Sequence, residues 1–251
     1  MAKNTSTRGR LRLLAEGLVV LVSILAAFLL EGWRDDREFE RETQLELINV
    51  RRELERNYDL ILAELSALQR VNGASAVLIE MLERSDGRGV TMVPDTLAWL
   101  ASVWSPTLDA SLGAVDALIA SGRLAQIDDP DLRLGLAGLK YRLEDALEEE
   151  LVARQIGLRD LVPLIRGDTD FNRLAVITTE FFGGGEEGAG TQEVVARRPV
   201  PSFGDVAYPT SAAVRNTLAF RQMWFDVGVA EYSRLLPHFE SLIGMVNRET
   251  E

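Results

Sequence analysis

The sequence predicts a mainly α-helical fold: an N-terminal transmembrane helix continues into a long helix, and an antiparallel helical bundle follows, with a glycine-rich loop or small hairpin insertion. Three observations predict this fold. Residues 13–30 form an apolar run with one charged side chain. Residues 35–84 lack proline and are rich in the helix formers Glu, Leu, Arg and Ala. Two further helix-forming stretches, about 130–165 and 210–247, flank a segment rich in glycine and proline.

The apolar run predicts a membrane span. Leu13 to Leu30 comprises 18 residues, which at 1.5 Å per residue reach roughly 27 Å, close to a hydrocarbon core of about 30 Å. Trp33 follows at a position where an amphipathic ring suits the headgroup layer. A cleavable signal peptide has a shorter apolar region that ends in small residues, whereas this run ends in Phe-Leu-Leu. We therefore expect an uncleaved signal-anchor, with a transmembrane helix over residues 13–33.

The charge pattern predicts the orientation of that span. The chain carries 27 basic and 39 acidic side chains and a net charge of −12; residues 1–12 carry +4, which leaves −16 for the rest. Basic residues favour the cytoplasmic side, so we expect a cytoplasmic tail at 1–12, a single pass through the membrane and a helical domain over 34–251 on the opposite side. The excess of basic residues before the span is small: four basic residues precede it, and three arginines follow it, Arg34, Arg37 and Arg41. The acidic charge disfavours nucleic acid as a partner.

Glu16 is the one ionisable residue inside the apolar run. An ionisable group within a span is a functional hypothesis, here a proton path or the pairing with a partner helix. The simpler interpretation is an ion pair at the interface with Arg12, one helical turn earlier. Both interpretations stay open, and the second is favoured from the residues alone.

The long helix beyond the span carries a seam that needs a partner. Apolar residues recur there at alternating spacings of three and four, with polar members at some turns. The seam runs through Leu47, Arg51, Leu54, Tyr58, Ile61, Leu65, Leu68, Asn72, Ser75, Ile79 and Leu82. The partner is either another helix of this chain or a second copy in a parallel coiled coil, and we favour the intramolecular bundle.

Capping signals predict the next elements. Two glycines near residue 88 end the long helix, and residues 90–93 form a connector or an edge strand. Asp95 caps a short helix that Ser105-Pro106 breaks, and a second short helix over Asp109–Ser121 ends at Gly122.

Asp129 and Pro130 then supply an N-cap and a first-turn proline for a helix that reaches about Ile165, with a bend near Pro163. In this helix the run Glu148-Glu149-Glu150 is interpreted as a solvated face.

Residues 171–209 change character, because glycines surround a small acidic cluster and three prolines follow. We expect a loop region with a hairpin, whose strands would be residues 175–182 and 192–196. Thr210 or Ser211 then caps a last helix that reaches about residue 247, with a kink at Pro237.

No catalytic motif is found, so we expect a protein that is not an enzyme and holds no cofactor and no metal. The absence of cysteine excludes disulfides and thiolate chemistry, and His238 is the single histidine. The GGGEEGAG run lacks the Lys-Ser/Thr of a phosphate loop, and Asp128, Asp129 and Asp131 lack the spacing of a calcium loop. Five aromatic residues line either an apolar ligand pocket or, as we favour, the ordinary core: Trp99, Trp104, Phe220, Trp224 and Phe225.

Several sequence marks occur together. Glu16 lies near the start of the apolar run and Trp33 just after it. The stretch 113–124 reads GAVDALIASGRL and is followed by Ile127, Asp129 and Leu132-Arg133, and NTLAFR occupies 216–221. In these marks, over most of the chain outside 171–209, the sequence resembles a family of uncharacterised bacterial single-pass membrane proteins. The resemblance implies a membrane-anchored helical architecture without an assigned activity, and it gives Glu16 more weight. It also singles out a motif of unknown role: Asp116, Ser121, Gly122, Arg123 and Arg133.

The leading functional hypothesis is a membrane-anchored, non-catalytic helical module that acts in sensing or protein interaction, since helices continuous with a span can transmit small displacements. Its partners would be the lipid bilayer and, through the long N-terminal helix, a membrane protein or a second copy. The alternative is a subunit of an inner-membrane complex that uses Glu16 for helix pairing or proton relay. No carboxylate spacing recommends a hydrolase.

Overall fold

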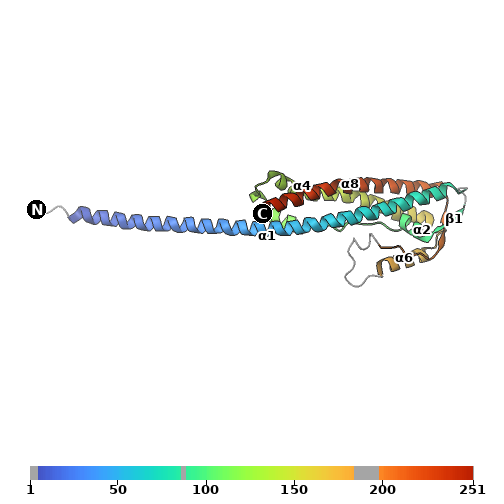
Figure 1. Ribbon diagram of the computed structural model, residues 1–251, viewed down its shortest axis with the longest axis horizontal. Coiled ribbons are helices and arrows are strands. Elements are labelled where there is room, and N and C mark those ends of the chain that lie inside the picture. The colour runs from blue at the N-terminus through green and yellow to red at the C-terminus, as the bar shows by residue number, and fades with distance from the viewer. Residues whose placement is uncertain (1–4, 86–88, 184–197, 251) are drawn as a thin grey trace.

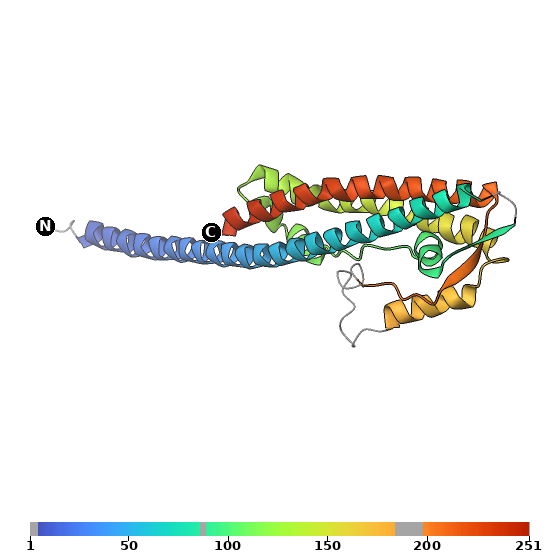
Figure 2. The same ribbon diagram turned by 45° about the vertical axis from the view of Figure 1, so that its right-hand side comes forward.

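The computed structural model describes residues 5–85, 89–183 and 198–250, without the side chains of residues 5–17, 19, 20 and 36. It confirms the mainly α-helical fold. Three long helices form the body: α1 (Thr5–Glu83), α4 (Pro130–Gln155) and α8 (Ala212–Thr250). Helix α8 runs antiparallel to both others, and the N-terminal part of α1 extends alone beyond the bundle (Figures 1 and 2).

The predicted seam of α1 packs within the chain. Six of its members are buried: Leu47, Leu54, Ile61, Leu68, Ser75 and Leu82. The main partner of α1 is α8. Polar pairs mark the register between the two helices: Arg51 with Asn247, Tyr58 with Glu240, and Asn72 with Asp226. From one pair to the next, the residue number rises by seven and then by fourteen on α1, and it falls by the same amounts on α8. A heptad seam between antiparallel helices requires this relation. The intramolecular bundle is thus confirmed.

Helix α4 begins as its local chemistry predicts, and the helical segments that continue it end at the expected Ile165. The Asp129 carboxylate accepts hydrogen bonds from the amides of Asp131 and Leu132, and Pro130 occupies the first turn. The helix then passes through a π-helical segment, η2 (Ile156–Leu161), into α5 (Val162–Ile165). The sequence predicts a bend near Pro163, and the structure has the π-helical segment just before this proline, whose ring removes one amide donor from the ladder.

The prediction for residues 171–209 is largely wrong. Residues Phe171–Gly183 form a helix, α6, and not a strand. Its buried side chains, Leu174, Ile177 and Phe181, share one helical face, so packing overrides the β propensity of the segment. Strand β2 (Asp205–Pro209) pairs antiparallel with β1 (Val90–Pro94), which confirms an edge strand at 90–93. The second expected strand, 192–196, lies outside the described residues.

Two short helices differ from the predictions. Helix α2 (Asp95–Ser102) begins with Asp95, but Pro94 occupies the N-cap position and no side chain caps the helix. The buried Asp95 carboxylate instead accepts hydrogen bonds from Ser202 Oγ and the Phe203 amide. Helix α3 (Gly113–Ala120) begins four residues later than the expected Asp109.

The delay in α3 has a tertiary cause. Asn57 of α1 bonds both the amide and the carbonyl of Ser111, which holds the preceding chain outside a helix. The predicted end is confirmed, because Gly122 adopts a left-handed φ of +77° just after the helix.

The last helix begins as expected. The Ser211 hydroxyl accepts a hydrogen bond from the Val214 amide, 3.3 Å away. Helix α8 contains Pro237 and extends to Thr250, three residues beyond the expected end.

Among the described residues, no helix is both long and apolar enough to cross a lipid bilayer. The side chains of Arg12 and Glu16, and residues 1–4 of the basic tail, lie outside what the structure describes. The transmembrane helix over residues 13–33 therefore stays a prediction.

Candidate functional site

The motif of unknown role lies at the end of the bundle from which α1 projects (Figure 2). It comprises α3, the 3₁₀ turn η1 (Arg123–Gln126) and the first turns of α4. Helix α3 has no capping side chain of its own; the Glu53 carboxylate of α1 instead accepts hydrogen bonds from the Ala114 and Val115 amides. An acidic side chain on α1 thus satisfies the positive end of α3.

Arg123 fastens the motif to α1. Its guanidinium pairs with the carboxylates of Glu42 and Glu46, and Ser121 Oγ donates to Glu46 at 3.2 Å. The guanidinium also lies over the Phe39 ring, 5.2 Å from its centroid. Gly122 makes this geometry accessible, because its left-handed φ turns the chain between the serine and the arginine. We call this group the Arg123 clamp: Ser121, Arg123, Glu42 and Glu46.

The two remaining motif residues play different parts. Arg133 donates to the carbonyls of Ile127 and Asp128, so it closes the loop between η1 and α4. Asp116 is exposed in the first turn of α3. The five residues of the motif therefore do not form one cluster.

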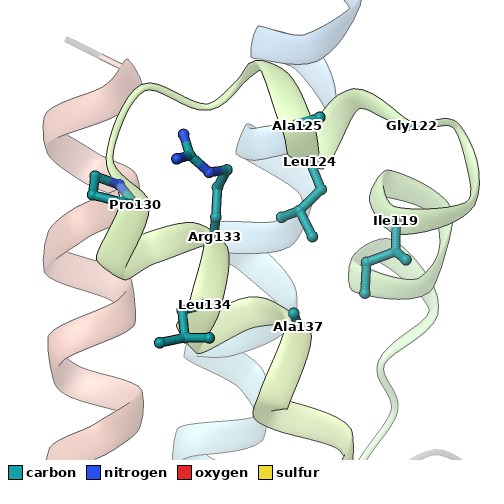
Figure 3. A pocket seen from close by; sticks show the side chains of 8 residues that line it. All are labelled: Ile119, Gly122, Leu124, Ala125, Pro130, Arg133, Leu134 and Ala137. Carbon is teal, nitrogen blue, oxygen red and sulfur yellow. The ribbon is translucent and has the colours of Figure 1, made fainter.

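An open apolar hollow of about 550 Å³ lies between η1 and α4 (Figure 3). In Figure 3, Leu124 points into it and Arg133 extends toward the adjoining loop. Leu134 on its rim is 75% exposed. The lining residues are Ile119, Gly122, Leu124, Ala125, Pro130, Arg133, Leu134 and Ala137. Three residues of the stretch 113–124, together with Arg133, therefore surround one surface depression.

The five aromatic residues expected to line one pocket or one core lie in three separate groups. Trp99 and Trp104 stack with centroids 5.6 Å apart and contact Phe181. A hollow of about 220 Å³ lies beside this pair and Arg154. Phe220 and Trp224 form a separate pair along α8, with centroids 6.4 Å apart.

The remaining aromatic, Phe225, lies buried under the guanidinium of Arg221. Arg221 is only 1% exposed, and sequence reasoning gave it no role. It donates to the carbonyls of Ala101, Trp104 and Ala153 and to Ser105 Oγ. Burial lowers the pKa of Arg221 to about 10. The sequence does carry a pattern that could reveal a buried arginine, because Arg221 interrupts the apolar stripe of α8 between Leu218 and Phe225.

Gly157 explains how such a large group fits. A Cβ on Gly157 would lie 2.9 Å from Arg221 Nε, so only glycine lets the π-helical segment approach this closely. Arg221 thereby joins the ends of α2 and α4 to α8.

The predicted membrane-interface residue Trp33 is exposed on the projecting part of α1, and the Arg37 guanidinium lies 4.4 Å from its ring centroid. Within the described part of the chain, no group of three or more His, Asp or Glu side chains is placed to hold a metal ion. Comparison of the chain with known protein families, with curated proteins and with solved structures found no match.

Proposed function

We propose that this protein is a membrane-anchored, non-catalytic helical module that acts in sensing or in protein interaction. The observation that carries the proposal is the continuity of α1, which joins an exposed apolar segment to the packed bundle in one helix.

The apolar segment suits a lipid environment better than a single protein partner. Its exposed side chains are Leu18, Leu21, Val22, Ile24, Leu25, Phe28, Leu29, Leu30 and Trp33. They point around the whole helix, since the consecutive residues 28–30 cannot share one face. One partner helix covers one face only, whereas a bilayer covers all of them. The structure describes the side chains of only part of the apolar run in the sequence, Leu13–Leu30.

The Arg123 clamp lies near the proposed anchor. Glu42 and Glu46 follow Trp33 by nine and thirteen residues, which corresponds to roughly 14–20 Å along the helix. With Trp33 at the interface, the clamp and the hollow belong to the part of the bundle nearest the membrane. A displacement of α1 would reach them first, and a partner in the membrane would have them within reach.

The proposed topology places residues 1–12 in the cytoplasm and the bundle in the periplasm of a bacterium. Reporter fusions after residue 251 test it: a reporter active only outside the cytoplasm should respond, and one active only inside should stay silent. The opposite pattern refutes the orientation and leaves the anchor untouched.

Membrane extraction of the full chain tests the anchor. The wild-type protein should stay in the membrane fraction after an alkaline carbonate wash. The double variant Val22→Arg/Leu25→Arg should leave that fraction, because arginine at the centre of a span costs about 2.5–3.5 kcal/mol per residue on insertion scales. The matched control, Leu62→Arg/Val77→Arg, places the same charges at exposed positions of the same helix within the bundle and should stay in the membrane. Release of the wild-type chain by carbonate would contradict the proposal.

A further inference from the structure

Two glutamates face each other in the core of the bundle. Glu64 of α1 is 2% exposed and Glu150 of α4 is 6% exposed, which corrects the interpretation of Glu148-Glu149-Glu150 as a wholly solvated face. Both occupy positions of apolar seams: Ile61 and Leu68 flank Glu64, and Ala146 and Ala153 flank Glu150, all buried. The two carboxyl groups are within hydrogen-bonding distance of each other.

The two carboxyl groups differ in the hydrogen-bond donors that surround them. Glu150 Oε1 accepts a hydrogen bond from the Tyr232 hydroxyl of α8, and Glu150 Oε2 accepts one from the Leu108 amide at 3.2 Å. Glu64 Oε1 is buried, and no donor among the described residues reaches it. Hydrogen bonds therefore stabilise the charged form of Glu150, whereas Glu64 Oε1 accepts no such bond.

The charges that face the pair do not neutralise it. Asp109, from the segment between α2 and α3, repels a charge on Glu64. Arg154, one turn after Glu150 on α4, favours a charge on Glu150 alone. Helix α8 contributes Tyr232, which donates a hydrogen bond without bringing a positive charge.

We infer that Glu64 and Glu150 form a proton-binding site, in which one proton lies between the two carboxyl groups, with Glu64 as donor and Glu150 as acceptor. Two bare carboxylates in this place would repel each other and leave a buried acceptor unpaired; one proton converts the repulsion into a hydrogen bond. The site joins α1 to α4 and, through Tyr232, to α8. Loss of the proton would put a second negative charge between the three helices and loosen their packing. The inference does not depend on membrane anchoring, because all of these groups lie within the bundle.

The electrostatics agree with this assignment. Burial, followed by the neighbouring Glu150 charge, raises the pKa of Glu64 well above its usual value. Burial raises the pKa of Glu150 to about 7, although its hydrogen bonds from Tyr232 and Leu108 act in the opposite direction. The folded chain therefore binds this proton more tightly than the unfolded chain. The contribution of this pair to stability should be greatest at low pH, should fall as the pH rises from about 4.5 through about 7, where Glu150 ionises, and should fall further when Glu64 loses its proton at higher pH.

Infrared spectroscopy of the full chain in detergent or lipid nanodiscs tests the site directly. At pH 8, above the pKa of about 7 of Glu150, the wild-type protein should still show the carbonyl stretch of a buried protonated carboxyl group, that of Glu64, and the band should disappear at higher pH. Glu64→Gln should remove the band. Glu148→Gln, a matched change at an exposed position of α4, should retain it. Absence of the band from the wild-type protein, or its persistence in Glu64→Gln, would overturn the inference.

Thermal unfolding supplies a second readout. The midpoint of the wild-type chain should fall as the pH rises from 5 to 8. Glu64→Gln, which mimics the protonated side chain, should flatten this dependence and unfold at a higher temperature than the wild type at pH 8. Glu148→Gln should follow the wild-type curve. A pH dependence in Glu64→Gln as steep as in the wild type would contradict the proposal even if the variant folds less well.

Discussion

Replacing Arg221 with methionine should destabilise the bundle by about 3 kcal/mol. Arg221 joins α8 to the ends of α2 and α4 through four hydrogen bonds, to Ala101 O at 2.5 Å, Trp104 O at 2.8 Å, Ala153 O at 3.2 Å and Ser105 Oγ at 2.6 Å. Methionine fills a similar space beside Phe225 but donates none of these bonds.

The magnitude follows from two opposing effects. Hydrogen bonds from a charged donor contribute about 1.5–3 kcal/mol each, so four of them contribute about 6 kcal/mol at the lower end. Burial of the guanidinium opposes this gain. The lowering of the Arg221 pKa to about 10 corresponds to a cost of roughly 3 kcal/mol. The difference, about 3 kcal/mol, is a large part of the stability of an ordinary domain.

Urea unfolding of the full chain, followed by tryptophan fluorescence, measures the effect, because the stacked Trp99 and Trp104 lie beside Arg221. The control is Arg248→Met, an exposed position on the same helix, which should change stability by no more than about 0.5 kcal/mol. Lysine at 221 should not restore the loss, because one ammonium cannot reach acceptors on separate elements. A loss below about 1 kcal/mol for Arg221→Met would refute the view that these four bonds outweigh the cost of burial.

Four further predictions concern single positions. Gly157→Ala should destabilise the chain by about 1–3 kcal/mol in thermal or urea unfolding, because its Cβ would lie 2.9 Å from the Arg221 guanidinium, whereas Gly138→Ala in α4, with nothing within 4 Å, should stabilise it by about 0.5–1 kcal/mol. Asp129→Ala should cost about 1 kcal/mol through loss of the α4 cap, measured in the same way; an unchanged midpoint would contradict the cap. Arg123→Gln should speed amide hydrogen exchange in residues 119–127 while leaving exchange in α8 unchanged. If the protein is instead a complex subunit that uses Glu16, Glu16→Gln should release its partner during purification while the chain stays in the membrane fraction.

Local chemistry accounts for the parts of the fold that the sequence predicts well. The Asp129 cap, the first-turn Pro130 and the left-handed Gly122 depend on groups within a few residues of each other, and all three are confirmed. The seam of α1 is equally visible, because burial repeats along a single helix.

The errors arise where distant segments compete for the same groups. Asp95 has the sequence position of a cap, but Ser202 and Phe203, more than a hundred residues away, bind its carboxylate. Residues 175–182 carry β-branched side chains, yet their helix is favoured by the face that it buries. Glu150 looked solvated beside Glu148 and Glu149, and nothing near it in sequence reveals Glu64.

Polar contacts between the helices of this bundle fix their register, which a purely apolar seam would not determine. A purely apolar interface between α1 and α8 could slide by one heptad at modest cost, since similar side chains would meet again. Such a slide would separate Tyr58 from Glu240, withdraw Tyr232 from Glu150 and remove Arg221 from its carbonyls. Because Arg221 and Tyr232 are eleven residues apart on α8, roughly 16 Å, one rigid helix would have to break both contacts together. Under the proposed sensing function, a displacement of α1 should therefore change the protonation or the tilt of the helices, and should not slide one along another.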